Sequence, residues 1–149
     1  MADDMVSLRR ETAQWMQTLA DRAGAMDVDA EVIRTAARFG ELAVRQIEIE
    51  ESELDFDAMV AALGPVLAEQ REVAGELANR PVWSLLGLFQ LANAVLVGRP
   101  EMLDLQAGHT TEHALVAVLL RAVLNLTLQV TDQPPIHSFF PSLAPKHDA

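Results

Sequence analysis

Hydrophobic residues recur every three or four positions along most of the chain, and the longest strict alternation is Ile47–Ile49. Such spacing places apolar side chains on one face of an α-helix, whereas alternation is typical of a strand. The pattern therefore predicts an all-α protein, an antiparallel bundle of about five helices in a single domain. We assign residues 1–132 to the bundle. Residues 133–149 form a proline-punctuated tail that we expect to dock partly through Phe139 and Phe140.

The first three predicted helices are amphipathic. The second begins near Asp29, and its charged row is expected to be a solvated face: Arg34, Arg38, Glu41, Arg45 and Glu48. Ser52 or Asp55 is the expected N-cap of the third helix. Its apolar residues mark a stripe that we expect to be buried: Phe56, Val60, Leu63, Leu67, Ala74 and Leu77. The Gly64-Pro65 pair predicts a kink or a break in this helix.

The fourth and fifth predicted helices are apolar on nearly all sides. Residues 81–98 contain no charge, and Pro81 is the expected first residue of the fourth helix. Its length would suit a membrane span, but the polar residues within it favour a buried helix. The fifth helix is expected to run to about Thr131, before Pro134-Pro135. Because both helices need cover on every side, we expect them to be central or to lie at a homodimer interface.

The charge of the chain argues against several partners. It has 22 acidic and 11 basic residues, a net charge of −11. Such a surface repels nucleic-acid phosphates and anionic lipids, so we expect neither nucleic acid nor a membrane as a partner. The absence of cysteine excludes a thiolate nucleophile and Cys-based metal sites. The first residues, M-A-D-D-M, lack the features of a secretion signal, which predicts a cytoplasmic protein.

Residues 109–113 read H-T-T-E-H and fit the His-x-x-Glu-His pattern of some zinc peptidases. In that pattern His109 and His113 bind the metal and Glu112 is the catalytic base. Alternating helix directions bring the end of the second helix to the start of the fifth. Glu50 and Glu51, which we expect on the apolar side, would then complete a site for zinc, iron or manganese. No glutamate follows Glu112, so the downstream third ligand of a peptidase is missing.

The spacing of the two histidines also resembles the His-x-x-x-His of the last helix in DinB-like metal-binding bundles, which are similar in size and shape. The resemblance covers the start of the fifth helix and implies a metal held by the bundle. The third histidine of that family, in the second helix, has no counterpart in residues 27–53. Alternatively, Thr110 or Thr111 caps a helix that starts only there. Glu112 is then a first-turn acid, and His109 lies outside the helix.

Polar residues within the two apolar helices mark a second candidate site. Buried polar groups need hydrogen-bond partners, so these residues either form an interhelical network or orient a guest in a pocket. In a pocket, Arg121 would hold an anionic group. The predicted ligand-binding residues are Trp83, Phe89, Gln90, Asn93, Arg121 and Asn125.

Three functions follow from these patterns. The first is a binding or accessory protein that holds a small apolar or anionic molecule between helices. The second is a metal-dependent enzyme that uses His109, Glu112 and His113. The third is an interaction module whose apolar helices and tail dock on another protein. Because the chain has no nucleophile-elbow serine and no Gly-rich phosphate loop, we expect no catalytic triad and no nucleotide cofactor.

Overall fold

The computed structural model describes residues 2–23, 28–103, 116, 120 and 123, and all regular elements within them are helical. This confirms the all-α class. The elements are α1 (Ala2–Arg22), α2 (Ala30–Glu51), α3 (Phe56–Ala78), α4 (Leu85–Gly98) and the short 3-10 helix η1 (Pro100–Leu103). Of the predicted fifth helix, the described residues are Val116, Leu120 and Val123. The tail with Phe139 and Phe140 lies outside the described residues.

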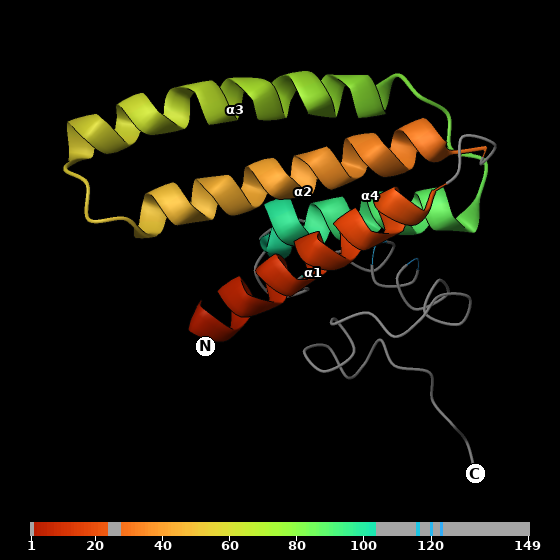
Figure 1. Cartoon of the computed structure of the whole chain (residues 1–149), viewed down its shortest axis with the longest axis horizontal. Helices are drawn as coiled ribbons and strands as arrows, with labels where there is room; N and C mark the ends of the chain where they lie inside the picture. Colours follow the sequence, from red (N-terminus) through yellow and green to blue (C-terminus); the bar gives the residue numbers. More distant parts are fainter. Residues whose placement is uncertain (1, 24–27, 104–115, 117–119, 121–122, 124–149) are drawn as a thin grey trace, which may run out of the picture.

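α2 is the central element of the described structure. It packs against α1, α3 and α4, and α1 also packs against α4. α3 lies on the far side of α2 from α1 and α4 (Figure 1), and among the described helices it contacts α2 alone. A helix with a single neighbour buries one stripe of its surface, so α3 leaves most of its circumference open.

The core lies where α1, α2 and α4 meet. Small residues on α2 let the helices approach closely: a Cβ atom at Gly40 would lie 3.3 Å from Met16 Sδ of α1. On α4, Phe89 and Leu96 are fully buried. Trp15 of α1 meets the Phe89 ring edge-on, with ring centroids 5.0 Å apart.

α1 and α4 run antiparallel and bury each other. Arg9 Nε donates a hydrogen bond to the Val97 carbonyl at 2.6 Å, and Gln90 Nε2 donates to the Met16 carbonyl at 3.1 Å. Leu120 and Val123 pack against the same cluster of α1 and α4 side chains. Residues of its own chain therefore bury α4 over most of its length, while Leu85 and Leu88 in its first turns are exposed.

α4 begins later than the sequence predicted. We expected Pro81 to be its first residue, but the helix starts at Leu85 with Ser84 as its N-cap, and Ser84 Oγ accepts a hydrogen bond from Gly87 N at 3.0 Å. The backbone N–H of Ser84 donates to the Asp29 carboxylate at 2.7 Å. This bond holds the preceding backbone away from α4, so the helix does not extend back to Pro81.

α3 is continuous through Gly64-Pro65, so a break at this pair is ruled out. Asp55 is its N-cap, as predicted, and its side chain accepts a hydrogen bond from Ala58 N at 2.8 Å. Pro65 has no N–H to donate to the Ala61 carbonyl. Both residues are exposed, so water can solvate that carbonyl and the helix tolerates the proline.

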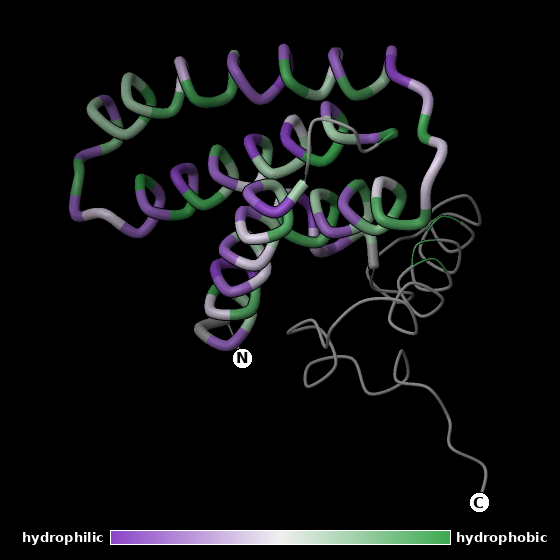
Figure 2. The backbone as a smooth tube through the Cα atoms, turned by 45° about the vertical axis from the view of Figure 1, so that its right-hand side comes forward, coloured by the Kyte–Doolittle hydropathy of each residue, from purple (hydrophilic) through white to green (hydrophobic). Residues whose placement is uncertain are grey.

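The face of α3 that packs on α2 overlaps the stripe that we expected to be buried only in part: Leu77 packs against the core, and Leu63 and Leu67 are half-buried. The buried residues of α3 are Val66, Gln70 and Val73. Gln70 Nε2 donates to Gln46 Oε1 of α2 at 2.9 Å. Phe56 is 77% exposed and Val60 is 52% exposed. Figure 2 shows that hydrophobic segments occur along the whole of α3. Since α2 is its sole described neighbour, one apolar face of α3 stays open.

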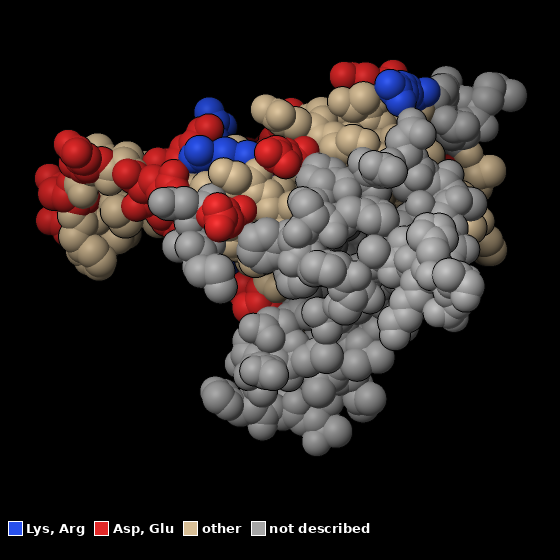
Figure 3. All heavy atoms as spheres, turned by 90° about the horizontal axis from the view of Figure 1, so that it is seen from below, with Lys and Arg blue, Asp and Glu red and all other residues tan. Residues whose placement is uncertain are grey.

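The surface is acidic where α2 passes into α3. Figure 3 shows Asp and Glu atoms gathered at that end of the molecule. The exposed acids of this turn are Glu50, Glu51, Glu53, Asp55 and Asp57. Within the part of the chain that the structure describes, no helix combines the length and the apolar character needed to cross a membrane.

Candidate functional site

Asp29 joins the start of α2 to the start of α4. It is the residue before α2, and its side chain is 3% exposed. The carboxylate accepts hydrogen bonds from Trp83 N at 3.0 Å, from Ser84 N at 2.7 Å and from Ser84 Oγ at 2.6 Å. These bonds replace the water that a carboxylate loses on burial.

Gly87 lets this carboxylate come close to α4. A Cβ atom at Gly87 would lie 2.4 Å from Asp29 Oδ2, far inside van der Waals contact. Ser84 completes the arrangement, because its hydroxyl donates to Asp29 and accepts from Gly87 N. We call Asp29, Ser84 and Gly87 the Asp29 clamp.

The clamp favours the ionised form of Asp29. Burial raises the pKa of this carboxyl group, but the hydrogen bonds from Ser84 Oγ and from the backbone N–H groups of Trp83 and Ser84 outweigh that effect. The pKa of Asp29 therefore lies below its ordinary value of 3.8. The positive end of the α4 dipole acts in the same direction. At neutral pH the clamp consists of charge-assisted hydrogen bonds, which are stronger than neutral ones.

An apolar surface lies beside the clamp. Trp83 is 74% exposed although its backbone N–H is bound to Asp29. Val28 precedes Asp29, and Leu85 and Leu88 lie in the first turns of α4; all three are exposed. We call Val28, Trp83, Leu85 and Leu88 the Trp83 patch. An exposed tryptophan on a fixed backbone has the properties of an interface hot spot, because it offers a large contact area with little freedom left to lose.

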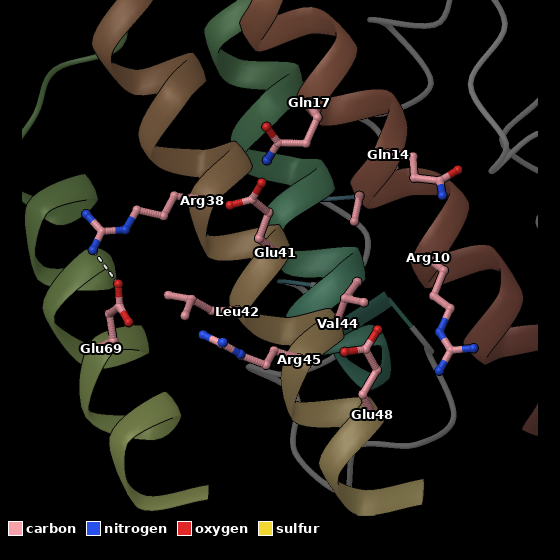
Figure 4. A pocket seen from close by; sticks show the side chains of 11 residues that line it. Arg10, Gln14, Gln17, Arg38, Glu41, Leu42, Val44, Arg45, Glu48 and Glu69 are labelled. Carbon is pink, nitrogen blue, oxygen red and sulfur yellow. Dashed lines mark hydrogen bonds and ion pairs between the residues drawn. The ribbon is translucent and has the colours of Figure 1, made fainter. Parts of the chain in front are cut away.

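A polar groove runs along α2 between α1 and α3 (Figure 4). It has a volume of about 580 Å³, and most of its lining side chains are charged or carry amides. Arg38 of α2 forms an ion pair with Glu69 of α3, and Gln17 Nε2 of α1 donates to the Ala37 carbonyl at 3.0 Å. The charged row of α2 is solvated, as the sequence predicted. This groove is not the predicted apolar pocket, which lies between the fourth and fifth helices and stays a prediction.

The predicted ligand-binding residues occupy different environments. Phe89 and Gln90 are fully buried between helices, whereas Trp83 faces solvent. Gln90 Nε2 donates to backbone carbonyls of α1 and α2 at 3.1 and 3.4 Å, as an interhelical network would require. Arg121 and Asn125 lie outside the described residues, so their role stays a prediction.

Three buried side chains keep polar atoms that have no hydrogen-bond partner among the described residues. These atoms are Thr12 Oγ1, Gln90 Oε1 and both amide atoms of Asn93. Because α1 and α4 run antiparallel, Thr12 and Asn93 lie at about the same height along the two helix axes. A buried polar atom without a partner costs roughly 1–3 kcal/mol. Asn93, a predicted ligand-binding residue, therefore has unused hydrogen-bonding capacity.

Two of the predicted metal ligands lie in the last turn of α2. Glu50 and Glu51 are exposed, whereas we expected them on the apolar side of the helix. In this turn Ile49 is the residue that packs against the α2–α3 core, and Glu50 and Glu51 take the solvent side. Glu51 Oε2 forms an ion pair with Arg10 Nη2 at 2.9 Å, and Glu50 accepts a hydrogen bond from Gln46 at 2.8 Å.

The remaining predicted metal-site residues are not described. His109, Glu112 and His113 lie outside the described residues, and their metal site stays a prediction. Across residues 2–23 and 28–103, no three His, Cys, Asp or Glu side chains come together in a way that could hold a metal ion.

The Asp29 clamp was not predicted from the sequence. The sequence indicated Asp29 only as the start of the second helix, but its carboxylate binds the start of α4, 55 residues from it at Ser84. The available signal was local: Ser84 followed three residues later by a glycine at the start of an apolar helix. That signal indicates a cap, but it does not identify the distant carboxylate.

Comparisons of the chain with protein-family models, with curated proteins and with solved structures found no match, so the function is argued from the geometry alone.

Proposed function

We propose that this protein is an interaction module that binds a partner protein through the Trp83 patch. The observation that carries the proposal is the exposure of Trp83 on a backbone fixed by Asp29. Soluble proteins rarely present a large aromatic side chain next to other exposed apolar residues without a binding role. This is the third of the functions derived from the sequence.

The charge of the chain supports a protein as the partner. A net charge of −11 opposes contact with phosphate backbones and anionic lipid. The patch offers one indole flanked by aliphatic side chains, which suits an apolar pocket on another protein. A neutral or basic rim around that pocket would complement the acidic surface.

Site-specific photo-crosslinking in cells that make the protein tests this proposal. A photoreactive residue in place of Leu88, which leaves Trp83 intact, is expected to give a discrete adduct with one protein. The same residue in place of Glu76, which is exposed on α3, is the control and should give no such adduct. Equal labelling at both positions would contradict the proposal.

A pair of substitutions separates binding from folding. Trp83→Ser should abolish the adduct formed by a crosslinker placed at Leu88, whereas Trp83→Phe should retain it. Because Trp83 is exposed, both variants should unfold within about 0.5 kcal/mol of the parent protein in urea. Loss of the adduct together with a large loss of stability would assign Trp83 a structural role instead.

A homodimer is also part of this proposal, with a different interface from the predicted one. The sequence suggested α4 as an interface helix, but α1, α2, Leu120 and Val123 cover α4. Apart from the Trp83 patch at the start of α4, the apolar face left open among the described helices belongs to α3.

Binding of a small molecule between α1 and α4 is a second candidate. It is favoured by Asn93, which is fully buried with both amide atoms unpartnered among the residues described. A guest with one donor and one acceptor would satisfy that amide. Native mass spectrometry of protein purified from its source should then show an added mass that Asn93→Leu removes. If both proteins have the mass of the chain alone, the result contradicts a bound small molecule.

A further inference from the structure

One face of α3 is apolar and open. At 100° per residue, five of its side chains cluster within about a quarter of the helix circumference, beside the face that packs on α2. We call them the α3 stripe: Phe56, Val60, Leu67, Ala74 and Ala78. Leu67 is half-buried and the other four are exposed.

The stripe borders a groove between α2 and α3. The groove has a volume of about 410 Å³, and its apolar lining consists of Phe39 of α2 with Leu67 and Ala74 of α3. Its polar lining consists of Gln70, Arg71 and Arg99. Phe39 and Leu67 are both half-buried, so each has apolar surface still in contact with water. A helix laid along the stripe would insert side chains into this groove and bury that surface.

The sizes of the stripe residues complement each other in an antiparallel pair. Bulky residues lie in the first half of the helix and alanines in the second. If two α3 helices meet antiparallel with Leu67 at the centre, Phe56 of one copy lies opposite Ala78 of the other. In the same register Val60 lies opposite Ala74. Large side chains thus face small ones at both ends of the contact, and the two Leu67 side chains meet at its centre.

The charges at the two ends of α3 favour the same arrangement. Its first turn is preceded by the exposed acids Glu53 and Asp55, and Arg80 follows its last turn. Antiparallel pairing brings Arg80 of one copy beside Asp55 of the other, whereas parallel pairing would place like charges together. Antiparallel helix dipoles also attract each other.

We infer that the α3 stripe binds the α3 stripe of a second copy of this chain, in antiparallel register, so that two α2–α3 hairpins form a four-helix bundle. This inference rests on the proposed function as an interaction module, but it uses a surface other than the Trp83 patch. Trp83→Ser should leave the dimer intact, so either proposal can fail without the other.

A matched pair of charge substitutions tests the stripe. Val60 and Ala61 are adjacent and both exposed, but their side chains point about 100° apart. Val60→Glu places a charge in the stripe, and Ala61→Glu places the same charge outside it. Sedimentation equilibrium at micromolar concentrations should show a dimer for the parent protein and for Ala61→Glu. Val60→Glu should raise the dissociation constant at least about tenfold.

Introduced cysteines test the register independently of Val60→Glu. The chain has no cysteine of its own, so added thiols react only with each other. Mixing Phe56→Cys protein with Ala78→Cys protein under mild oxidation should give a disulfide-linked dimer, because Cβ atoms must come within about 4.5 Å to form the bond. Phe56→Cys protein alone should not link.

Three results would overturn the inference. A parent protein that is monomeric throughout the micromolar range removes the dimer. A dimer that Val60→Glu leaves intact places the contact on another surface. Linking of Phe56→Cys protein to itself indicates parallel pairing.

Discussion

A single buried carboxylate determines how the start of α4 is held. Asp29 accepts hydrogen bonds from Trp83 and Ser84. In Asp29→Asn the charge is lost, and the new NH₂ group cannot accept a hydrogen bond. We expect the free energy of unfolding at neutral pH to fall by roughly 1.5–3 kcal/mol, measured by urea denaturation. Asp21→Asn, at an exposed position of α1, is the control and should change it by less than about 0.5 kcal/mol.

The contribution of Asp29 to stability depends on pH in a defined direction. Its pKa in the folded protein lies below the ordinary value of 3.8. A depressed pKa means that the unfolded chain binds the proton more readily, so the stabilisation is complete above the unfolded pKa and is lost as the pH falls through the folded one. The stability gap between the parent protein and Asp29→Asn should therefore be constant near neutral pH and shrink below about pH 4. A gap that widened toward acid would contradict the assigned shift.

At the level of the helices, two glycines should respond to alanine in opposite directions. Gly87 is in contact with Asp29, and an added Cβ would lie 2.4 Å from the carboxylate. Gly87→Ala should lower the free energy of unfolding by more than about 1 kcal/mol, despite the better helix propensity of alanine. Gly75 in α3 faces open space, so Gly75→Ala should raise it by about 0.5–1 kcal/mol. Thermal unfolding of both variants measures these changes. Equal changes in stability for Gly87→Ala and Gly75→Ala would contradict the prediction.

Local sequence chemistry predicted the ends of some helices well. Asp55 caps α3, and α4 ends at Gly98, both as expected. Such signals act within a turn of the helix, so they can be found without knowing the fold. The start of α4 was predicted four residues early. The Asp29 side chain, which lies just before α2 in the sequence, binds the backbone N–H of Ser84, and no local signal around Pro81 indicates this contact.

The buried face of α3 could not be predicted in the same way. Its sequence offers two apolar faces, and the one with larger side chains was expected to be buried. The structure buries Val66, Gln70 and Val73, with Leu77 of the expected stripe packed beside them, because α2 supplies a matching surface and an amide partner for Gln70. The choice between the two faces depends on the neighbouring helix, which the α3 pattern does not contain.

The candidate site residues could be named from the sequence, but their surroundings could not, and their role in binding stays a prediction. Trp83 and Asn93 were both chosen as binding residues from their types and positions. The sequence could not show that Trp83 is exposed and Asn93 fully buried, since that depends on how α1 and α2 cover α4. The Asp29 clamp joins residues that are far apart in the chain, so it required the structure.

At the scale of the whole molecule, the arrangement of helices is uneven. α1, α2 and α4 share a core, whereas α3 adds to α2 from the outside. In a monomer, α3 should therefore open more easily than the core helices. Hydrogen–deuterium exchange of Val60→Glu should show faster exchange in residues 56–78 than in residues 85–98. In the parent protein, pairing of α3 should slow exchange in residues 56–78, and similar rates in both proteins would argue against an α3 interface.

Thermal unfolding should depend on protein concentration if the α3 dimer forms. A dimer that unfolds to two chains is stabilised by mass action, by about 1.4 kcal/mol of dimer for each tenfold increase in concentration. For a chain of 149 residues this corresponds to a rise in Tm of roughly 2 °C per tenfold step. Val60→Glu should show a Tm that is lower and independent of concentration, while Ala61→Glu should follow the parent protein. Calorimetry over a hundredfold range of concentration, about two steps of this size, measures both effects. A parent Tm that stays constant over that range would mean that folding of this chain does not depend on a second copy.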